Sequence, residues 1–389
     1  MKRIGLIVLT FSLLLAACGG ESAVCTDALG CVTVASGEAL TIAAMLTLSG
    51  PDAPYGIDAL RGVELAIADR GKVLNREVEL IQEDELCSPE GGKAAAERLA
   101  LNGDVIGVIG ATCSGASEAA AKILGQAGMT MISPSSTAAS LTEEKTRQPG
   151  FLRTIYNDKS QAGAVAEFVY VALGARKMAV IHDGSAYSQG LAEEACAVFE
   201  GYGGTCVAQF QMKSGSSPQG ALDHVKLFEP EVLYYPLYTV DGVAITKLAV
   251  KSGLGKAALI SSDGLLSKDF VSQVEAEAQG MYLSGPSVSK IDPSFYEKYE
   301  ARYHEKPIAV YAAQAYDAAM ILFDAIEKAG KKQGGTIVIS RQALRSALFA
   351  TRNFHGLSGI LTCSTLGDCA IPNIVINQVR GLEFDPVYP

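Results

Sequence analysis

The chain has 389 residues and a formal net charge of −10, with 42 acidic and 32 basic side chains. Nucleic-acid binding needs clustered Lys and Arg, and the sequence has no basic patch or RNA-binding motif, so we expect no nucleic-acid partner. About 370 residues follow the N-terminal segment, which are too many for one typical domain and predict two lobes with separate cores.

The N-terminus has the order of a secretory signal peptide. Lys2 and Arg3 precede an apolar run from Ile4 to Leu15, and small residues follow, which predicts a signal peptide over residues 1–17. The apolar run is about twelve residues long, whereas a membrane-spanning helix needs roughly twenty. Removal of the two positive charges takes the formal charge from −10 to −12. We therefore expect an exported protein.

The end of this segment, Leu15-Ala16-Ala17-Cys18, resembles the bacterial lipobox. In that type of signal the Cys is lipidated and becomes the new N-terminus, and each buried methylene of an acyl chain contributes about 0.8 kcal/mol to anchoring. The resemblance predicts lipidation of Cys18 and a lipidated tether over residues 18–40, which would hold the protein at the cell envelope. The alternative is an ordinary signal peptide with a chance Cys.

Eight cysteines remain after Cys18, an even number in an exported chain, which favours disulfides. Eight cysteines allow 105 pairings, and the sequence leaves the pairing open, although joining near neighbours closes the shortest loops. A zinc site is the alternative, but the spacings do not match Cys-x2-Cys and the four histidines are scattered. We expect no metal and no cofactor. The candidate disulfide residues are Cys25, Cys31, Cys87, Cys113, Cys196, Cys206, Cys363 and Cys369.

Short apolar segments alternate with longer amphipathic ones up to residue 133. This order predicts a parallel sheet with helices on both faces. The expected strands are 40–46, 78–83, 105–110 and 130–133, and the expected helices are 61–70, 91–101 and 117–125.

A connecting strand at 151–154 leads into a second series of the same kind. Each series opens with a strand, a polar loop carrying a Tyr beside a small residue (Tyr55-Gly56 and Tyr187-Ser188), and a helix, which is a weak internal repeat. Ligands of open α/β sheets bind at the carboxyl ends of the strands, so two such edges would face each other across a cleft. The expected helices are 161–173, 188–202, 219–227, 241–252, 294–304 and 311–329, and the expected strands are 177–182, 205–210, 232–236, 258–261 and 280–284.

Several spaced motifs, taken in order, resemble the leucine/isoleucine/valine-binding proteins of ABC transporters. The similarity covers about residues 41–330, and motifs in a fixed order are more specific than any one of them. The motifs are Ser49-Gly50-Pro51 with Tyr55-Gly56, Arg61 to Ala66, Asp84 to Pro89, Val108 to Gly115, Ile132 to Thr137, Val180 to Asp183 with Tyr187 to Leu191, and Tyr234-Tyr235.

This resemblance implies an α/β fold of the type I periplasmic binding protein, with two doubly wound parallel-sheet lobes joined by a multi-crossover hinge. It implies a binding protein without enzymatic activity that passes an amino acid or similar small molecule to an ABC permease, and we expect a monomer. It also implies a disulfide between Cys87 and Cys113. The N-terminal lobe would comprise 41–156 plus 287–360, and the C-terminal lobe 157–286 plus 361–389.

The ligand carboxylate is expected beside Ser114 and Thr137. Ser114 follows a buried strand and precedes a helix, where backbone N–H groups and the helix dipole favour an anion. Thr137 likewise follows a strand and the rigid Pro134. In the family, the matching residues bind the ligand carboxylate through hydroxyl and backbone groups. The alternative is that these hydroxyls only cap helices.

The ligand ammonium is expected beside Asp263, the carbonyl of Ser135 and the hydroxyl of Tyr238. Burying an ammonium requires a charged or multiply accepting partner. The family commonly has Glu where this chain has Asp263, and the shorter side chain argues against plain leucine specificity. The alternative interpretation of Asp263 is an Asp-Gly turn.

The wall of the side-chain pocket is expected, by position matching with the family, at Tyr55, Thr112, Tyr187 and Tyr311. Tyrosines combine an apolar face with a polar tip, although they are also common in ordinary cores. Thr112 stands where leucine binders have an aliphatic residue. These features predict a ligand more polar than leucine.

Two other functions compete with transport. An enzyme lacks support, because the sequence has no G-x-S-x-G elbow and no Walker A pattern, and Gly253 to Ala258 follows a helix and precedes a strand, the reverse of the dinucleotide-binding order. A ligand-sensing protein that signals to a membrane receptor would have the same fold.

The segment around Cys363 and Cys369 departs from the family, and we expect a small disulfide loop that stabilises a hairpin or marks a partner surface.

Overall fold

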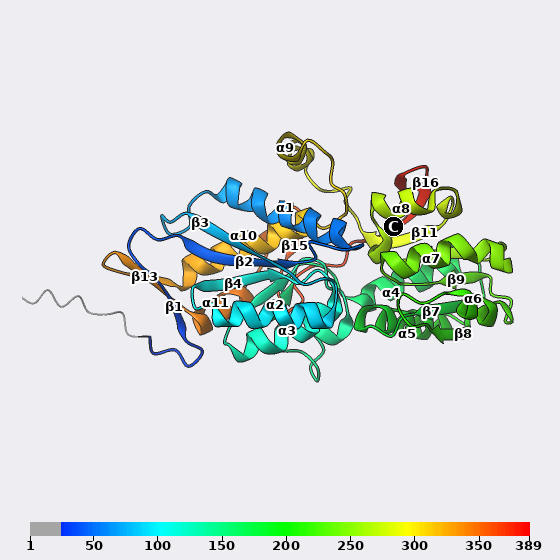
Figure 1. Cartoon of the computed structure of the whole chain (residues 1–389), viewed down its shortest axis with the longest axis horizontal. Coiled ribbons are helices and arrows are strands. Elements are labelled where there is room, and N and C mark those ends of the chain that lie inside the picture. Colours follow the sequence, from blue (N-terminus) through cyan, green and yellow to red (C-terminus); the bar gives the residue numbers. More distant parts are fainter. Residues whose placement is uncertain (1–24) are drawn as a thin grey trace, which may run out of the picture.

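The computed structural model describes residues 25–389. The predicted signal peptide, Cys18 and the first residues of the predicted tether lie outside the described residues. Two α/β lobes lie side by side along the long axis of the molecule (Figure 1). Within the described part of the chain, no helix combines the length and the apolar character that a membrane crossing needs.

The first lobe is built on a five-stranded sheet with the order β3-β2-β4-β5-β6, in which every neighbouring pair is parallel. All six residues of β4 are buried, as expected of a parallel strand with helices on both faces. The strands are β2 (Leu40–Leu46), β3 (Val78–Asp84), β4 (Val105–Gly110), β5 (Met131–Ser133) and β6 (Phe151–Arg153).

Successive residues of these strands pack against opposite layers of helices, as the two-residue period of a strand requires. Ile42 and Ala44 face α1, α10 and α11, whereas Ala43 and Met45 face α2 and α3. The helices are α1 (Ala53–Arg70), α2 (Pro89–Leu101), α3 (Ser114–Gln126), α10 (Ala312–Ala329) and α11 (Arg341–Phe349).

Helix α1 begins at Ala53, eight residues before the predicted start at 61. Pro54 favours this start, because its fixed φ suits the first turn of a helix. Backbone N–H groups in that turn have no acceptor within the helix, so the N–H that Pro lacks is not needed there. Gly56 allows close packing, since a Cβ on it would lie 1.9 Å from the Thr47 carbonyl oxygen. The predicted polar loop around Tyr55 is therefore the first turn of a helix, and this turn carries Tyr55 to the edge of the sheet.

Smaller elements complete the first lobe. An antiparallel sheet of order β1-β13-β12 includes residues 31–34, so the predicted tether is corrected to end before Cys31. Helix α9 packs through Phe295 and Tyr299 on Leu65 of α1. These elements are β1 (Cys31–Val34), β12 (Gly330–Gln333), β13 (Thr336–Ser340), β14 (Phe354–His355), β15 (Ile360–Leu361), α9 (Pro293–Tyr303) and the short η1 (Ala139–Leu141).

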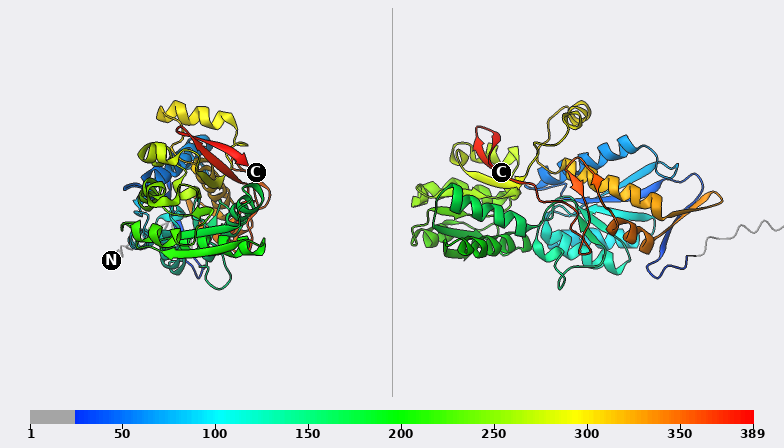
Figure 2. Two further views of the ribbon diagram at one scale, coloured as in Figure 1. Left: turned by 90° about the vertical axis from the view of Figure 1, so that its right-hand side faces the viewer. Right: turned by 180° about the vertical axis from the view of Figure 1, so that it is seen from behind.

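The second lobe has a seven-stranded sheet of order β17-β16-β11-β10-β9-β7-β8. Its first five strands in the chain run parallel, and the C-terminal strands β16 and β17 add an antiparallel edge (Figure 2). The strands are β7 (Lys177–His182), β8 (Thr205–Gln211), β9 (Val232–Tyr234), β10 (Ala258–Ser261), β11 (Tyr282–Pro286), β16 (Ile374–Arg380) and β17 (Glu383–Tyr388).

Helices cover both faces of this sheet as well. Met178 and Val180 of β7 pack on α4 and α5, and Ala179 and Ile181 pack on the side of α6, α7 and α8. The elements are α4 (Asp158–Glu167), α5 (Ala186–Gly201), α6 (Gln219–Lys226), α7 (Thr239–Ala249), α8 (Lys268–Val274), and the short η2 (Phe168–Ala172), η3 (Val250–Leu254), η4 (Asp263–Leu265) and η5 (Glu275–Ala278).

Within the described residues the chain passes between the lobes three times: from β6 to α4, from β11 to α9, and from β15 to β16. The last crossing differs from the predicted boundary at 361, because Leu361, Cys363 and Cys369 belong to the apolar core of the first lobe. The boundary is corrected to the segment between Ala370 and β16. Strand β15 has only two residues, so no sequence periodicity marked this segment.

The eight cysteines pair with their near neighbours along the chain, which was the scheme with the shortest loops. The Cys363–Cys369 loop is not a free surface feature: both half-cystines are 1% exposed and lie against the first core. The disulfides are Cys25–Cys31, Cys87–Cys113, Cys196–Cys206 and Cys363–Cys369.

Candidate ligand-binding site

A small cavity lies between the two lobes, where the carboxyl ends of their strands meet. Its volume is about 10 Å³, which is room for about one water molecule. Seven of the nine predicted ligand-binding residues line it, and Ser114 and Thr137 do not. The lining residues are Tyr55, Thr112, Cys113, Ser135, Tyr187, Tyr238, Asp263, Gly264 and Tyr311.

A wider hollow opens elsewhere on the second lobe, beside Lys226, Glu231 and Lys256. It lies at the amino ends of β9 and β10, the edge of the sheet opposite the cleft. Its charged lining side chains are exposed rather than buried. Ligands of open α/β sheets bind at the carboxyl ends of the strands, so the cleft between the lobes is the candidate site.

Asp263, in the short helix η4 after β10, is the central acid of the cleft and is 1% exposed. Its Oδ1 accepts hydrogen bonds from Gln161 Nε2 at 2.9 Å and Tyr187 OH at 2.8 Å, and its Oδ2 accepts from Tyr311 OH at 2.7 Å. All three donors are neutral. Burial raises the pKa of Asp263 above its ordinary value, and these hydrogen bonds oppose the rise. Among the described residues, the carboxylate thus has hydrogen bonds but no counter-ion.

Hydrogen bonds join the two lobes across the cleft. Tyr55 OH of the first lobe donates to Gly264 O of the second at 2.7 Å, and Thr239 N of the second lobe donates to Asp52 Oδ1 of the first at 3.0 Å. The Tyr311–Asp263 bond is a third such contact. All of these atoms are buried, so the lobes are closed on each other at the site.

Aromatic rings form much of the wall. Tyr187 and Tyr238 stack with their ring centroids 4.9 Å apart, and Tyr55 meets Tyr311 edge-on at 6.0 Å. Burial raises the pKa of Tyr187 well above its ordinary value, and the charge of Asp263 adds to this rise. These phenols therefore stay neutral and act as hydrogen-bonding groups rather than as bases.

The first-lobe side of the cleft contains the two predicted hydroxyls. Ser114 is the first residue of α3, Cys113 holds the N-cap position, and Ser114 Oγ accepts from Ala138 N at 3.1 Å. The Thr137 hydroxyl is buried without a hydrogen-bond partner. Neither hydroxyl caps a helix of its own, which removes the alternative of helix capping alone. The backbone N–H of Ser114 lies by the Tyr238 hydroxyl and opposes the burial that raises the pKa of this phenol.

A buried acid supports the loop that follows β4. Glu85 Oε1 accepts from Thr47 Oγ1 at 2.5 Å and from the backbone N–H groups of Thr112 and Cys113 at 3.2 and 3.3 Å. The neighbouring Cys87–Cys113 disulfide ties the same loop to the acidic segment. Burial raises the pKa of Glu85 to about 7. The cleft-lining Thr112 is thus fixed from behind.

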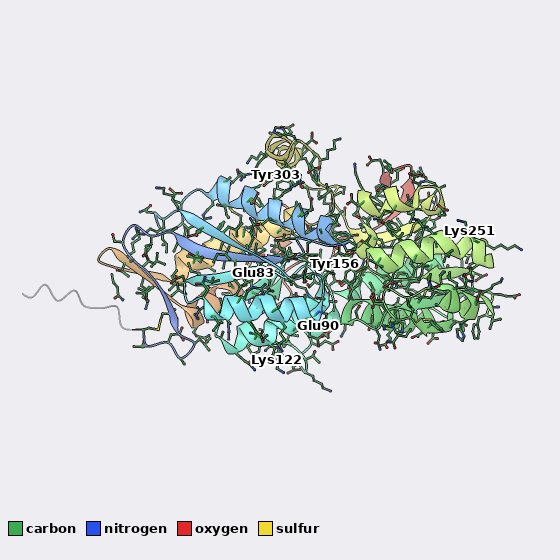
Figure 3. The ribbon with its side chains drawn as sticks, viewed as in Figure 1. Glu83, Glu90, Lys122, Tyr156, Lys251 and Tyr303 are labelled. Carbon is green, nitrogen blue, oxygen red and sulfur yellow. A yellow bond between two sulfur atoms is a disulfide. The ribbon has the colours of Figure 1, made fainter. Side chains whose placement is uncertain are left out.

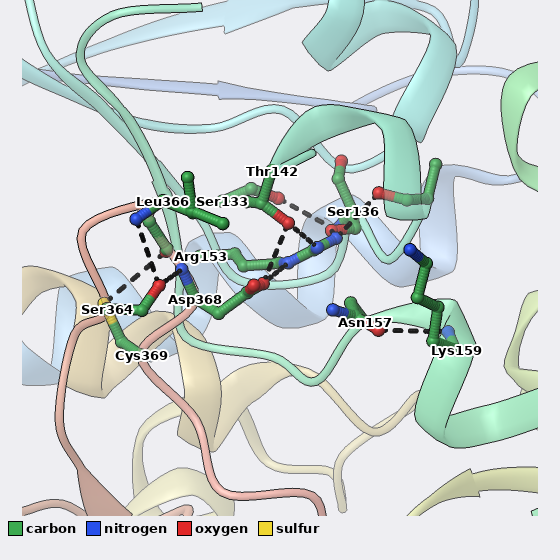
Figure 4. A network of polar contacts seen from close by, with 12 residues as sticks. Ser133, Ser136, Thr142, Arg153, Asn157, Lys159, Ser364, Leu366, Asp368 and Cys369 are labelled. Atoms are coloured by element: carbon green, nitrogen blue, oxygen red, sulfur yellow. Dashed lines mark hydrogen bonds and ion pairs between the residues drawn. The ribbon is translucent and has the colours of Figure 1, made fainter. Parts of the chain in front are cut away.

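A second network holds the hinge (Figure 4). Arg153, fully buried at the end of β6, donates to Asp368 Oδ1 at 2.6 Å and to the carbonyls of Ser136 and Ala138 at 3.2 and 2.9 Å. It also donates to the hydroxyl of Thr142. Since Ser136 and Ala138 flank Thr137, this Arg fixes the predicted carboxylate loop.

The partner of Arg153 comes from the segment that departed from the family pattern. Asp368 lies within the Cys363–Cys369 loop, and Arg153 N donates to Gly367 O at 2.9 Å. The loop therefore supports the hinge.

Sequence reasoning missed a group of buried polar residues beside the cleft. Gln161 of α4 bonds Asp263, and Tyr156 lies between the two lobes (Figure 3). Asp158 and Tyr234 are also fully buried there. Asn157-Asp158 has the pattern of an ordinary helix start, with Asn157 as the N-cap, so nothing in the sequence separated Asp158 from a capping residue.

Two doubly wound lobes closed over a buried polar cleft define a type I periplasmic binding protein. The chain belongs to the periplasmic binding protein family, whose model matches residues 39–366. Members of this family bind solutes, so the protein is a solute-binding protein and not an enzyme.

Curated relatives and solved structures agree with this assignment. The chain is 26% identical to the Leu/Ile/Val-binding protein homolog 3 of Brucella melitensis, over 88% of this chain and 94% of that protein. It is also 26% identical to the leucine-, isoleucine-, valine-, threonine- and alanine-binding protein of Pseudomonas aeruginosa, over 81% and 84% of the two chains.

A leucine-binding protein from Thermotoga maritima superposes with a TM-score of 0.81 at 27% identity and covers 90% of this chain and 97% of its own. A benzoate-bound solute-binding protein from R. palustris has a TM-score of 0.78 at 21% identity, with 90% and 96% covered. At that identity the second likeness shows the fold alone. The same fold therefore occurs in a protein crystallised with a ligand that lacks an amino group.

Proposed function

We propose that the chain is an extracytoplasmic, lipid-anchored solute-binding protein of an ABC importer, and that it binds an amino acid or an amino-acid-like molecule between its lobes. The relatives support the ligand class, since they are named as binding proteins for leucine, isoleucine, valine and other amino acids. The lipobox-like sequence at Cys18 supports the anchor. A permease is the partner implied by the family.

The observation that carries this proposal is the uncompensated charge of Asp263. A buried carboxylate is stable when a cation or several donors accompany it, and every donor to Asp263 is neutral. A ligand ammonium would supply the missing counter-ion. An amine-free acid such as benzoate would instead add a second negative charge next to Asp263.

The opposite side of the cleft suits the carboxylate of the same ligand. The backbone N–H of Ser114 stands at the start of α3, a helix of 13 residues, where partial positive charge favours an anion. The Thr137 hydroxyl has no hydrogen-bond partner in the fold. A zwitterion placed between Ser114 and Asp263 would therefore meet a donor set at one end and an acid at the other.

The wall of the cleft supports a ligand more polar than leucine. Thr112, Ser135 and four tyrosines line it, and each brings a hydroxyl to a mostly aromatic surface. Asp263 is shorter by one methylene than the Glu common in the family, which changes the distance to the ligand amine. We expect an amino acid with a polar or aromatic side chain.

Hinge closure is the proposed binding mechanism. A cavity of about 10 Å³ is far smaller than any amino acid, so entry requires the lobes to separate. The buried bonds between Tyr55 and Gly264 and between Asp52 and Thr239 would form only in the closed state. A ligand that touches both lobes stabilises that state by its contacts with the second lobe.

A thermal-shift screen tests the proposal. The purified chain is screened against the common α-amino acids, small amides, short peptides and amine-free aromatic acids. A ligand at one hundred times its Kd stabilises the fold by about 2.7 kcal/mol, which raises Tm by a few degrees. We expect a shift with one class of α-amino acid. A shift with amine-free acids alone would discard the ammonium site, and no shift with any compound would overturn the proposed function.

A further inference from the structure

A cluster of buried polar atoms beside the cleft has no hydrogen-bond partner among the described residues. Native proteins leave few such atoms, because each one costs desolvation energy. Here several occur together, on the loop after β5, the crossover into α4, α4 itself and β9. The atoms are Thr137 Oγ1, Tyr156 OH, Asp158 Oδ1, Asp158 Oδ2, Gln161 Oε1 and Tyr234 OH.

These atoms adjoin the site already described. Asp158 N donates to the Thr137 carbonyl at 2.9 Å, and Gln161, one turn further along α4, donates to Asp263. The charge of Asp263 adds to burial in raising the pKa values of Asp158, Tyr156 and Tyr234. The cluster therefore lies beside the cleft, around the crossover into α4, and its side chains do not line the small cavity itself.

The chemistry of the cluster is that of an acceptor. The ionised carboxylate of Asp158 accepts hydrogen bonds and donates none, and the same holds for the Oε1 atom of Gln161. The hydroxyls of the cluster can accept as well as donate. The buried Arg153 is a nearby cation whose charge opposes the rise in the pKa of Asp158. Its guanidinium bonds Asp368, Thr142 and backbone carbonyls instead, so Asp158 has no direct ion pair among the described residues. A primary ammonium, with three N–H donors and a positive charge, complements such a group.

Asp158 and Asp263 differ in the hydrogen bonds that their carboxylate oxygens already accept. Each oxygen of Asp263 already accepts a hydrogen bond from a side chain. Neither oxygen of Asp158 accepts one of good geometry, and only the neighbouring Thr137 hydroxyl opposes the rise in its pKa as a side-chain donor. A ligand amine therefore gains more by bonding to Asp158 than by replacing donors on Asp263. Asp158 is also the first residue of α4, directly after the crossover, where its backbone N–H bonds the Thr137 loop of the first lobe.

We propose that Asp158 is a second anionic contact for the ligand, so that the cleft holds a primary amino group between Asp158 and Asp263. This inference rests on the proposed function. It makes the amino group the chief specificity determinant: a ligand with a hydroxyl in its place brings one donor and no charge to two acids. The other occupant of the cluster would be water, which has no effect on that preference.

Paired ligands test the inference. The α-amino acid that binds most tightly in the screen is titrated by calorimetry, alongside the 2-hydroxy acid with the same side chain. We expect the parent chain to prefer the amino acid by at least about tenfold, the loss typical of one charge-assisted buried hydrogen bond. In Asp158→Asn, which keeps the size of the side chain, this preference should fall by about tenfold or more.

Asp317→Asn is the matched control, since Asp317 is buried but bonds Leu357 and Ser358 outside the cleft. It should leave the preference within about twofold of the parent. If Asp158→Asn does not fold, Asp158→Ser replaces it, because Ser is tolerated at a helix N-terminus. An unchanged preference in a folded Asp158 variant overturns the inference while the proposed function stands. If no α-amino acid binds the parent, both fall.

Discussion

Replacing Asp263 with Asn separates the charge of this side chain from its hydrogen bonds. The Asn oxygen can accept from Gln161 and Tyr187, as Oδ1 does now, and the Asn amide can donate to the oxygen of Tyr311. Shape and partners are thus kept, and only the negative charge is lost. Because a charge-assisted buried hydrogen bond contributes about 1.5–3 kcal/mol, the Kd for an α-amino acid should rise about ten- to hundredfold.

The substitution that weakens ligand binding should not lower the stability of the chain without ligand. Burial raises the pKa of Asp263, so the folded chain holds this proton more tightly than the unfolded chain does. The free energy of unfolding therefore decreases as the pH rises from the ordinary pKa of Asp to the raised one. Asp263→Asn lacks this penalty, and without ligand at pH 7 it should be as stable as the parent or more stable.

Calorimetric titration and urea denaturation of the same preparations measure the two effects. Tyr311→Phe is the control, because its hydroxyl has Asp263 as its partner and carries no charge at neutral pH. It should lower affinity by less than the Asn substitution does. A Kd within about threefold of the parent in a stable Asp263→Asn chain would refute the assignment of the ammonium site.

Three further predictions concern residues that support the loops and helices around the cleft. Burial raises the pKa of Glu85 to about 7, so the free energy of unfolding of the parent should fall by about 3 kcal/mol between pH 4.5 and pH 7. Glu85→Gln should not show this fall, and denaturation at a series of pH values measures it. Asp368→Asn should destabilise the chain by about 2–3 kcal/mol in urea, since Arg153 keeps its other acceptors but loses its counter-ion. Gly56→Ala should lower Tm by several degrees, because its Cβ would meet the Thr47 carbonyl, whereas Gly163→Ala, in open space on α4, should leave Tm unchanged or raise it.

The order of strands and helices was predictable because their apolar patterns are long and regular. β4 is a continuous apolar run, and its neighbours alternate with helices that have one apolar face. Element starts were less predictable. Pro54 and Gly56 have the composition of a loop, yet Pro is favoured in a first helical turn and this Gly is required by the contact with Thr47.

The C-terminal segment shows where local pattern fails. β15 and the Cys363–Cys369 loop have no periodicity, and their place depends on Arg153, more than two hundred residues earlier in the chain. Only the tertiary structure reveals that the first lobe extends through Ala370 and that β16 begins the last pass into the second lobe.

Some residues of the candidate site could be predicted from the sequence, and others could not. Tyr55, Tyr187 and Asp263 were predictable because they follow strands at the carboxyl edge and match motifs of a known family. Asp158 and Gln161 were not, since a polar residue in a first helical turn is ordinary in sequence. Their burial and the unpaired acceptor atoms of their side chains become visible only in the three-dimensional structure.

A crystal structure of the chain with the α-amino acid from the screen would show directly how the cleft holds its ligand. We expect the ligand between closed lobes, with its carboxylate at the Ser114 N–H and the Thr137 hydroxyl, and its ammonium within about 3 Å of a cleft carboxylate. A ligand bound outside the cleft, or with its carboxylate against Asp263, would contradict this binding mode.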